Sequence, residues 1–160
     1  MQNQFRLIAA PFTPFDLYDM QKCMKAGPGL EVFHGYDETL LCGLSLGVRS
    51  AVGSTYNYIP SVYRNVVDSF MAGDMERARQ AQLQSVKLVD VLNRHGGGVM
   101  GGKAIMNIAG IACGECRIPV VPFLPEEYRE LEKEIEELNM LDYATVSRPV
   151  RPGQVVNGRA

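Results

Sequence analysis

The feature that most constrains this 160-residue chain is its shortage of β-strand sequence beside an abundance of helical sequence. Short apolar runs that end in proline, glycine or polar residues predict at most three strands, at residues 7–10, 30–33 and 51–52. Apolar periodicity and capping residues predict helices at residues 17–26, 37–46, 60–71, 74–95, 103–111 and 126–141. A parallel sheet of three strands cannot bury both faces well or close into a barrel. Either further strands are missing or the chain depends on partners.

The alternation of helices with the second and third predicted strands indicates crossover units and a parallel sheet. Ligands of such sheets lie beyond the carboxyl ends of the strands. Here both strands lead into glycine and polar residues, in Gly35-Tyr36-Asp37-Glu38 and Gly53-Ser54-Thr55-Tyr56-Asn57. These side chains can serve either as helix-cap and turn residues or as hydrogen-bond partners of ligand hydroxyls, and both alternatives stay open. His34, which ends a strand, is interpreted as a structural histidine with its own partner.

The character of the sequence changes after Gly73, where long helical patterns replace the strand–helix alternation. We therefore expect a partial α/β portion at residues 1–73 and a helical extension at residues 74–146. The last predicted helix carries many glutamates, which is typical of an exposed helix face. Residues 147–160 are rich in proline, glycine and polar residues and are expected to form a disordered tail.

The charge pattern excludes several classes of partner. The net charge is −2 and the lysines and arginines are scattered, so the chain lacks the basic patch of a nucleic-acid-binding protein. No apolar run approaches the roughly 18–20 residues that a membrane span needs. The N-terminus also lacks the pattern of a secretory signal. We expect a cytoplasmic protein with no nucleic-acid or membrane partner.

Two motifs resemble a metal site and a nucleotide site, but each lacks residues that such a site needs. Cys113-Gly114-Glu115-Cys116 is a C-x-x-C, but neither histidine is spaced to complete a zinc site. The run from Gly97 to Lys103 fits the front of a phosphate-binding loop, yet Ala104 stands where Ser or Thr should bind magnesium. A predicted helix rather than a strand precedes these glycines, so we interpret them as a flexible connector between helices. No metal ion and no cofactor is expected.

The two glycine-led segments also carry a family resemblance. Gly35-Tyr36-Asp37-Glu38 and Gly53-Ser54-Thr55-Tyr56-Asn57, separated by an apolar helix, resemble the C-terminal half of the N-acetylneuraminate lyases. These enzymes are the sialic acid aldolases of the dihydrodipicolinate synthase/N-acetylneuraminate lyase family. The resemblance extends from about Asp16 to Leu141 and includes residues 16–20, 72–74, 103–106 and 117–119.

The resemblance implies a (β/α)8 TIM barrel followed by a helical extension, usually assembled as a homotetramer. It also implies class I aldolase chemistry, in which a lysine forms a Schiff base with N-acetylneuraminate and a tyrosine assists proton transfer. Retro-aldol cleavage then yields pyruvate and N-acetylmannosamine, because the protonated imine accepts the electrons left on the pyruvate fragment. In such a lyase, the residues that match Gly35, Asp37, Glu38 and Ser54 contact the sugar chain, so these four are the expected substrate-binding residues.

The chain departs from this family pattern at the catalytic strand. Pro11 stands where the resemblance places the Schiff-base lysine, and residues 7–16 instead resemble the first strand of the barrel. Roughly half of a barrel of about 250 residues is absent, including the strand with the catalytic tyrosine. None of the remaining lysines matches the catalytic position; they are Lys22, Lys25, Lys87, Lys103 and Lys133.

The expected fold is therefore an incomplete (β/α)8 TIM barrel, made of strand 1 and the last two βα units, followed by the helical extension. No catalytic residue is assigned, and we expect the chain to lack lyase activity. The alternative is a non-catalytic isoform that associates with full-length lyase subunits or with itself. A block skipped by splicing, or an error in the gene model, would account for the deletion.

Overall fold

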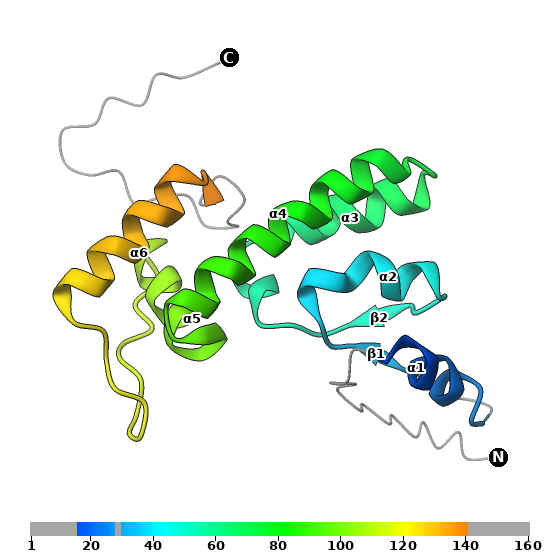
Figure 1. Ribbon diagram of the computed structural model, residues 1–160, viewed down its shortest axis with the longest axis horizontal. Coiled ribbons are helices and arrows are strands. Elements are labelled where there is room, and N and C mark those ends of the chain that lie inside the picture. The colour runs from blue at the N-terminus through cyan, green and yellow to red at the C-terminus, as the bar shows by residue number, and fades with distance from the viewer. Residues whose placement is uncertain (1–15, 28–29, 141–160) are drawn as a thin grey trace.

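The computed structural model describes residues 16–27 and 30–140, which form a small sheet and a body of helices (Figure 1). The elements are α1 (Leu17–Met24), β1 (Phe33–His34), the 3-10 turn η1 (Asp37–Thr39), α2 (Leu40–Ser45), β2 (Ser50–Ala51), the 3-10 turn η2 (Thr55–Asn57), α3 (Pro60–Met71), α4 (Met75–Arg94), α5 (Gly97–Ile108) and α6 (Pro125–Glu137). Within the described part of the chain, no helix is both long and apolar enough to span a membrane.

The sheet consists of β1 and β2, which run parallel and are joined through α2. Phe33 lies opposite Ser50 and His34 opposite Ala51, so the predicted parallel crossover is confirmed. The predicted strand bounds were wrong, because pairing in residues 30–33 is confined to its last residue and extends to His34 instead. A strand forms only where a neighbouring backbone offers hydrogen bonds, and β2 is two residues long. The predicted strand at residues 7–10 lies outside the described residues, as does the tail.

The helix boundaries of α3 and α4 follow the capping signals in the sequence. Pro60 occupies the first turn of α3, where its missing N–H costs nothing. Gly73 has a positive φ of 79° just after α3, a conformation that favours glycine. Asp74 then caps α4, because its side chain accepts a hydrogen bond of 3.0 Å from the N–H of Arg77.

The glycine-rich segment before residue 103 is helical, so its interpretation as a flexible connector was wrong. α5 begins at Gly97 and includes the whole run. Glycine lowers helix stability in isolation, but here it lets other elements approach the helix closely. A Cβ atom at Gly102, for example, would lie 2.6 Å from the hydroxyl of Tyr58. Tertiary packing has overridden the local propensity.

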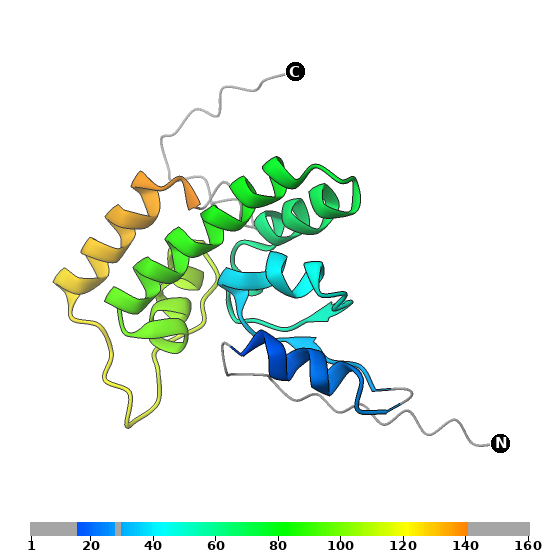
Figure 2. The same cartoon turned by 45° about the vertical axis from the view of Figure 1, so that its right-hand side comes forward.

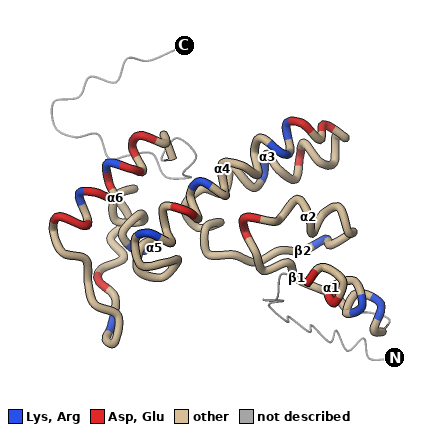
Figure 3. The backbone as a smooth tube through the Cα atoms, viewed as in Figure 1, with Lys and Arg blue, Asp and Glu red and all other residues tan. Residues whose placement is uncertain are grey.

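The last helix also ends earlier than predicted. α6 stops at Glu137 instead of continuing to residue 141. Asn139 adopts a φ of 51°, which is the left-handed conformation that terminates helices. The acidic residues of α6 lie along its length together with basic ones, as Figure 3 shows, and the predicted exposed face is confirmed.

One apolar core runs through the helical body. α4 is the central element: α3 packs along one part of it and α5 and α6 along the other (Figures 1 and 2). An ion pair from Arg94 and a hydrogen bond from His95, both to Glu134, connect the end of α4 to α6. The buried apolar side chains come from α2, α3, α4, α5 and α6, and those with essentially no exposure include Val62, Val66, Leu88, Val91, Ile105, Leu131 and Ile135. Because α4 also contacts η1, the helical body holds the loop that follows β1 in place.

Candidate functional site

The loops after β1 and β2 meet at the carboxyl edge of the sheet, as the parallel pairing requires. Asp37 from the first loop is 6% exposed and connects the two. Its Oδ2 accepts hydrogen bonds from the backbone N–H of Thr55 at 2.9 Å and from the Thr55 hydroxyl at 2.5 Å. The parallel sheet thus brings the two loops into contact at Asp37 and Thr55.

The side chain of Asp37 does not cap the helix that follows it. Its described hydrogen bonds go across to η2, so of the two alternatives left open for Asp37, helix capping does not apply. The first turn of α2 is satisfied from elsewhere, because Oε1 of Gln82 accepts a hydrogen bond of 2.8 Å from the N–H of Leu41.

The second carboxylate oxygen of Asp37 is buried and has no hydrogen-bond partner among the described residues. It lies directly over the backbone of Gly53, where an added Cβ atom would be 1.5 Å from this Oδ1. Buried polar atoms nearly always have a partner, so an orphaned oxygen at a strand end is a reasonable place for a ligand donor. Gly53 leaves the room that this arrangement needs.

Two tyrosines, Tyr56 and Tyr63, lie near this carboxylate. The Tyr63 hydroxyl is hydrogen-bonded to the Thr55 hydroxyl, and the ring of Tyr56 packs edge-on against Tyr63 with centroids 4.2 Å apart. The Tyr56 hydroxyl is buried without a partner among the described residues. Burial raises the pKa of both tyrosines, and the nearby Asp37 carboxylate raises them further. Both tyrosines are therefore neutral at physiological pH.

Burial also raises the pKa of Asp37, although the two hydrogen bonds from Thr55 oppose that shift. The carboxylate is thus held in a poorly solvated place by a single neighbouring residue. Such a group gains more from an additional hydrogen-bond donor than an exposed carboxylate does.

The other three predicted residues occupy different positions around Asp37. Gly35 is half-buried between β1 and η1, and Glu38 is half-buried beside Asp37 in η1. Ser54 is exposed and lies against α5, since an added Cβ atom at Gly98 would be 3.0 Å from the Ser54 hydroxyl. The structure thus places Gly35, Asp37 and Glu38 in one segment, with the segment of Ser54 beside it.

Ser54 also interacts with the tyrosine that follows η2. Burial raises the pKa of Tyr58, and a side-chain hydrogen bond with Ser54 acts in the opposite direction. The same tyrosine donates a hydrogen bond of 3.4 Å to the carbonyl oxygen of Gly98. The Ser54 loop is therefore fixed to α5 through Tyr58.

Some contributors to this region gave little signal in the sequence. Thr55 lies within the predicted polar segment at residues 53–57, but no feature of the sequence distinguishes it from its neighbours. Gln82 and Ser85 on α4 contact the backbone of Asp37 from a helix distant in sequence. A single sequence without spatial information offers no means of pairing α4 with η1.

His34 is structural, as predicted. It is 3% exposed, and its Nε2 lies 3.0 Å from the Thr39 hydroxyl. Burial lowers its pKa, which favours the neutral ring. Its ring packs against Gly43, where an added Cβ atom would approach to 2.8 Å.

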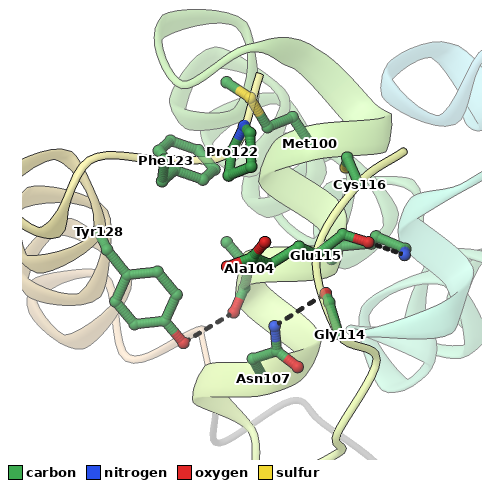
Figure 4. Close-up of a pocket in the computed structure, with 10 residues that line it drawn as sticks. Met100, Ala104, Asn107, Gly114, Glu115, Cys116, Pro122, Phe123 and Tyr128 are labelled. Atoms are coloured by element: carbon green, nitrogen blue, oxygen red, sulfur yellow. Dashed lines mark hydrogen bonds between the residues drawn. The ribbon is translucent and has the colours of Figure 1, made fainter. Parts of the chain in front are cut away.

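Asp37 lines neither of two hollows found among the described residues, although Tyr56 and Tyr63 line the second of them. A cavity of about 190 Å³ separates α5 from the loop that leads to α6 (Figure 4). In it Lys103 donates a hydrogen bond of 2.8 Å to the carbonyl oxygen of Glu115, and Asn107 bonds to Gly114. A wider groove of about 580 Å³ lies between α2, β2 and α3. All four cysteines are free, and the described residues hold no cluster of three or more His, Cys, Asp or Glu side chains placed to bind a metal ion.

Comparisons with known proteins place the sequence in a family. Residues 6–138 match the model of the dihydrodipicolinate synthetase family. The chain is 33% identical over 114 residues to the N-acetylneuraminate lyase of Rhizobium meliloti (strain 1021), covering 71% of this chain and 38% of the relative. Against the N-acetylneuraminate lyase of Citrobacter koseri it is 33% identical over 119 residues, which is 71% of this chain and 40% of the relative.

Solved structures agree with the sequence match. The N-acetylneuraminate lyase of Proteus mirabilis superposes with a TM-score of 0.76 and 32% identity, covering 81% of this chain and 44% of that one. The sialic acid aldolase of Aliivibrio salmonicida gives a TM-score of 0.75 and 32% identity over 82% of this chain and 44% of that one. The chain spans about two fifths of the length of these relatives, and the resemblance seen in its sequence is confirmed: it belongs to the dihydrodipicolinate synthetase family.

Proposed function

We propose that this chain keeps the sugar-hydroxyl side of an N-acetylneuraminate site, formed by Gly35, Asp37, Glu38 and Ser54, without lyase activity. The observation that supports the proposal is the buried Asp37 carboxylate at the carboxyl edge of a parallel sheet, held by Thr55 on one oxygen and without a hydrogen-bond partner among the described residues on the other. Residues 1–73 would be part of a TIM barrel and residues 74–146 its helical extension, in a cytoplasmic protein.

The positions of the lysines support the absence of Schiff-base chemistry. A Schiff base needs an amine that reaches the substrate carbonyl. All five lysines lie on helices or at a helix end rather than on β1 or β2. Lys103, on α5, donates a hydrogen bond to the carbonyl oxygen of Glu115. Pro11 stands where the family resemblance places the catalytic lysine. Removing the nucleophile of a covalent mechanism leaves at most binding effects.

Trapping with borohydride tests this part of the proposal. The purified chain is incubated with pyruvate and sodium borohydride, and its mass is measured. We expect the mass to stay unchanged, while the Rhizobium meliloti lyase treated in parallel serves as the positive control. A covalent pyruvate adduct on this chain would overturn the proposal.

Binding is tested separately with N-acetylmannosamine in a titration followed by NMR. We expect weak binding that shifts the amide signals of Asp37, Glu38 and Thr55. The Glu38→Gln variant should weaken it by about fivefold or more, because hydrogen bonds to charged groups are the stronger ones. Glu130→Gln on the exposed face of α6 is the matched control. Equal affinity of the two variants would count against the site.

A second candidate function is association with full-length lyase subunits. The loop before α6 exposes apolar side chains, with Ile118 at 93%, Val121 at 73% and Leu124 at 55%. Several exposed apolar side chains in one loop favour an interaction surface over single scattered ones. Light scattering of this chain mixed with the Rhizobium meliloti lyase should then show a mixed species. Finding only the separate components removes this candidate.

A further inference from the structure

The segment that carries Asp37 and Glu38 is held from behind by one side chain of α4. The amide of Gln82 contacts both ends of this segment: Nε2 donates 3.0 Å to the carbonyl oxygen of Asp37, and Oε1 accepts 2.8 Å from the N–H of Leu41. Both of its functional groups are thereby used. Because donor and acceptor must both be present, a glutamine fits this position and a glutamate does not.

A second side chain of α4 completes the contact. Ser85 has no solvent exposure; its hydroxyl accepts a hydrogen bond from Nε2 of Gln82 and lies 2.8 Å from the Gln82 carbonyl oxygen and 3.4 Å from the Asp37 carbonyl oxygen. Its single O–H hydrogen is directed mainly to the nearer Gln82 carbonyl oxygen. The Asp37 carbonyl oxygen additionally accepts from the N–H of Leu40 within the η1 turn. The Asp37 carbonyl oxygen thus accepts from the Gln82 side chain and from the Leu40 N–H, with the Ser85 hydroxyl 3.4 Å away, and these contacts restrict the position of this peptide.

The two ends of Asp37 are therefore fixed by different elements. Its backbone is held by α4, and one oxygen of its carboxylate is held by Thr55 in η2. What remains without a partner among the described residues is Oδ1. An anchored carboxylate whose second oxygen lacks a hydrogen-bond partner among the described residues is preorganised, and preorganisation lowers the entropic cost of binding.

We propose that Gln82, supported by Ser85, is a positioning residue that sets the geometry of Asp37 and Glu38 for a polyhydroxyl ligand. This inference rests on the proposed sugar site. It assigns a role in ligand recognition to α4, which lies in the helical extension and outside the strand-end loops.

The test uses the full chain with the substitution Gln82→Glu. Glutamate keeps an acceptor for the Leu41 N–H but presents an oxygen, rather than an N–H, to the Asp37 carbonyl. The control is Gln80→Glu on the same helix, where the exposed side chain bonds only to Glu76 among the described residues. Ser85→Ala is a second variant that removes the hydroxyl to which Nε2 of Gln82 donates, and it provides a readout should Gln82→Glu fail to fold.

Two measurements separate positioning from a merely structural role. The first needs no ligand: hydrogen exchange of the Thr55 N–H, whose acceptor is the Asp37 carboxylate, should accelerate by about fivefold in Gln82→Glu relative to buried amides of α6. The second is affinity for N-acetylmannosamine, which should fall by about fivefold in the same variant. Gln80→Glu should change neither.

The outcomes are distinguishable. A folded Gln82→Glu protein with unchanged Thr55 exchange and unchanged affinity overturns the inference, even if its thermal stability is lower. If the unsubstituted chain binds no N-acetylmannosamine, the proposed function fails, while the Thr55 exchange still decides whether Gln82 positions Asp37. Should Gln82→Glu not fold, normal Thr55 exchange in Ser85→Ala overturns the inference.

Discussion

The Asp37 carboxylate packs so closely against the backbone of Gly53 that no room is left for the Cβ atom of any other residue. An added Cβ atom would lie 1.5 Å from Oδ1 and 2.3 Å from the carboxyl carbon, well inside contact distance. Gly53 contributes backbone atoms and Asp37 a short side chain that is hydrogen-bonded to Thr55, so moving either group away would cost stability. The requirement for glycine here is steric and comes from a residue on another loop.

We predict that Gly53→Ala lowers the free energy of unfolding by about 2 kcal/mol or more, since it displaces a buried carboxylate from its two Thr55 donors. The loss is measured by urea denaturation. Gly27→Ala is the control, because its Cβ would meet Leu30 at an ordinary 3.6 Å. A Gly53→Ala protein as stable as the control would show that the carboxylate relaxes without cost.

The raised pKa of Asp37 predicts a specific pH dependence. Burial raises this pKa above the unfolded value of about 3.9, so the folded chain binds more protons between the two pKa values. Stability contributed by this carboxyl therefore falls as pH rises through that window. Asparagine does not titrate, so the unfolding free energy of Asp37→Asn relative to the unsubstituted chain should rise with pH there.

Urea denaturation at steps between about pH 3.5 and 7 checks this expectation. Asp68→Asn on the exposed side of α3 is the control for the loss of one negative charge. A curve for Asp37→Asn that runs parallel to that of the unsubstituted chain would mean that Asp37 titrates alike in the folded and unfolded states.

The sequence indicated which two loops carry the candidate site, but not which of their residues are in contact. Asp37 and the Gly53–Asn57 segment were identifiable because each follows a short strand, and parallel strands bring their carboxyl ends together. The partner of Asp37 was not identifiable, because Thr55 and Ser54 are equivalent in a sequence pattern. In the structure the Thr55 hydroxyl points to Asp37, while Ser54 lies toward Tyr58 and Gly98.

Among the elements, α5 shows how packing can use a sequence that disfavours a helix. Three glycines on this helix face three different neighbours: Gly98 faces Ser54, Gly101 faces Leu92 and Gly102 faces Tyr58. The predicted connector is thus a helix whose small residues admit the ends of other elements.

We predict opposite outcomes for alanine at two of these glycines. Gly102→Ala should destabilise by about 1–3 kcal/mol, since its Cβ meets the buried Tyr58 at the hydroxyl and at ring atoms 3.1 Å away. Gly98→Ala should be neutral or more stable by up to about 1 kcal/mol, because the exposed Ser54 side chain can rotate and alanine favours the helix. Thermal unfolding of both variants checks the order, and a more stable Gly102→Ala would contradict it.

Element types were more predictable than element bounds. Pro60, Gly73 and Asp74 marked the ends of α3 and α4 correctly, because capping is a local property. The strands and α5 were misplaced because their extent depends on neighbours. The sheet ends where pairing with β2 ends, and α5 forms because Tyr58 and Leu92 pack on its glycines.

At the scale of the whole molecule, α4 decides whether the chain behaves as one unit. It packs against α3, which belongs to the expected portion at residues 1–73, and against α5 and α6 of the expected extension. The apolar core includes Leu40 from α2 and Leu131 from α6 in one cluster. A core that crosses the expected division at residue 73 favours a single cooperative transition.

We therefore predict that Leu40→Ala and Leu131→Ala, each removing a side chain at most 3% exposed, destabilise both portions together. Each should lower the free energy of unfolding by about 2–5 kcal/mol, the usual cost of a buried Leu→Ala change. Hydrogen exchange of Val66 in α3 and of Ile135 in α6 is measured in both variants, with the 53% exposed Leu83→Ala on α4 as control. If Leu131→Ala accelerates exchange in α6 and leaves α3 protected, the two portions unfold separately, and the division at residue 73 is a division between stability units.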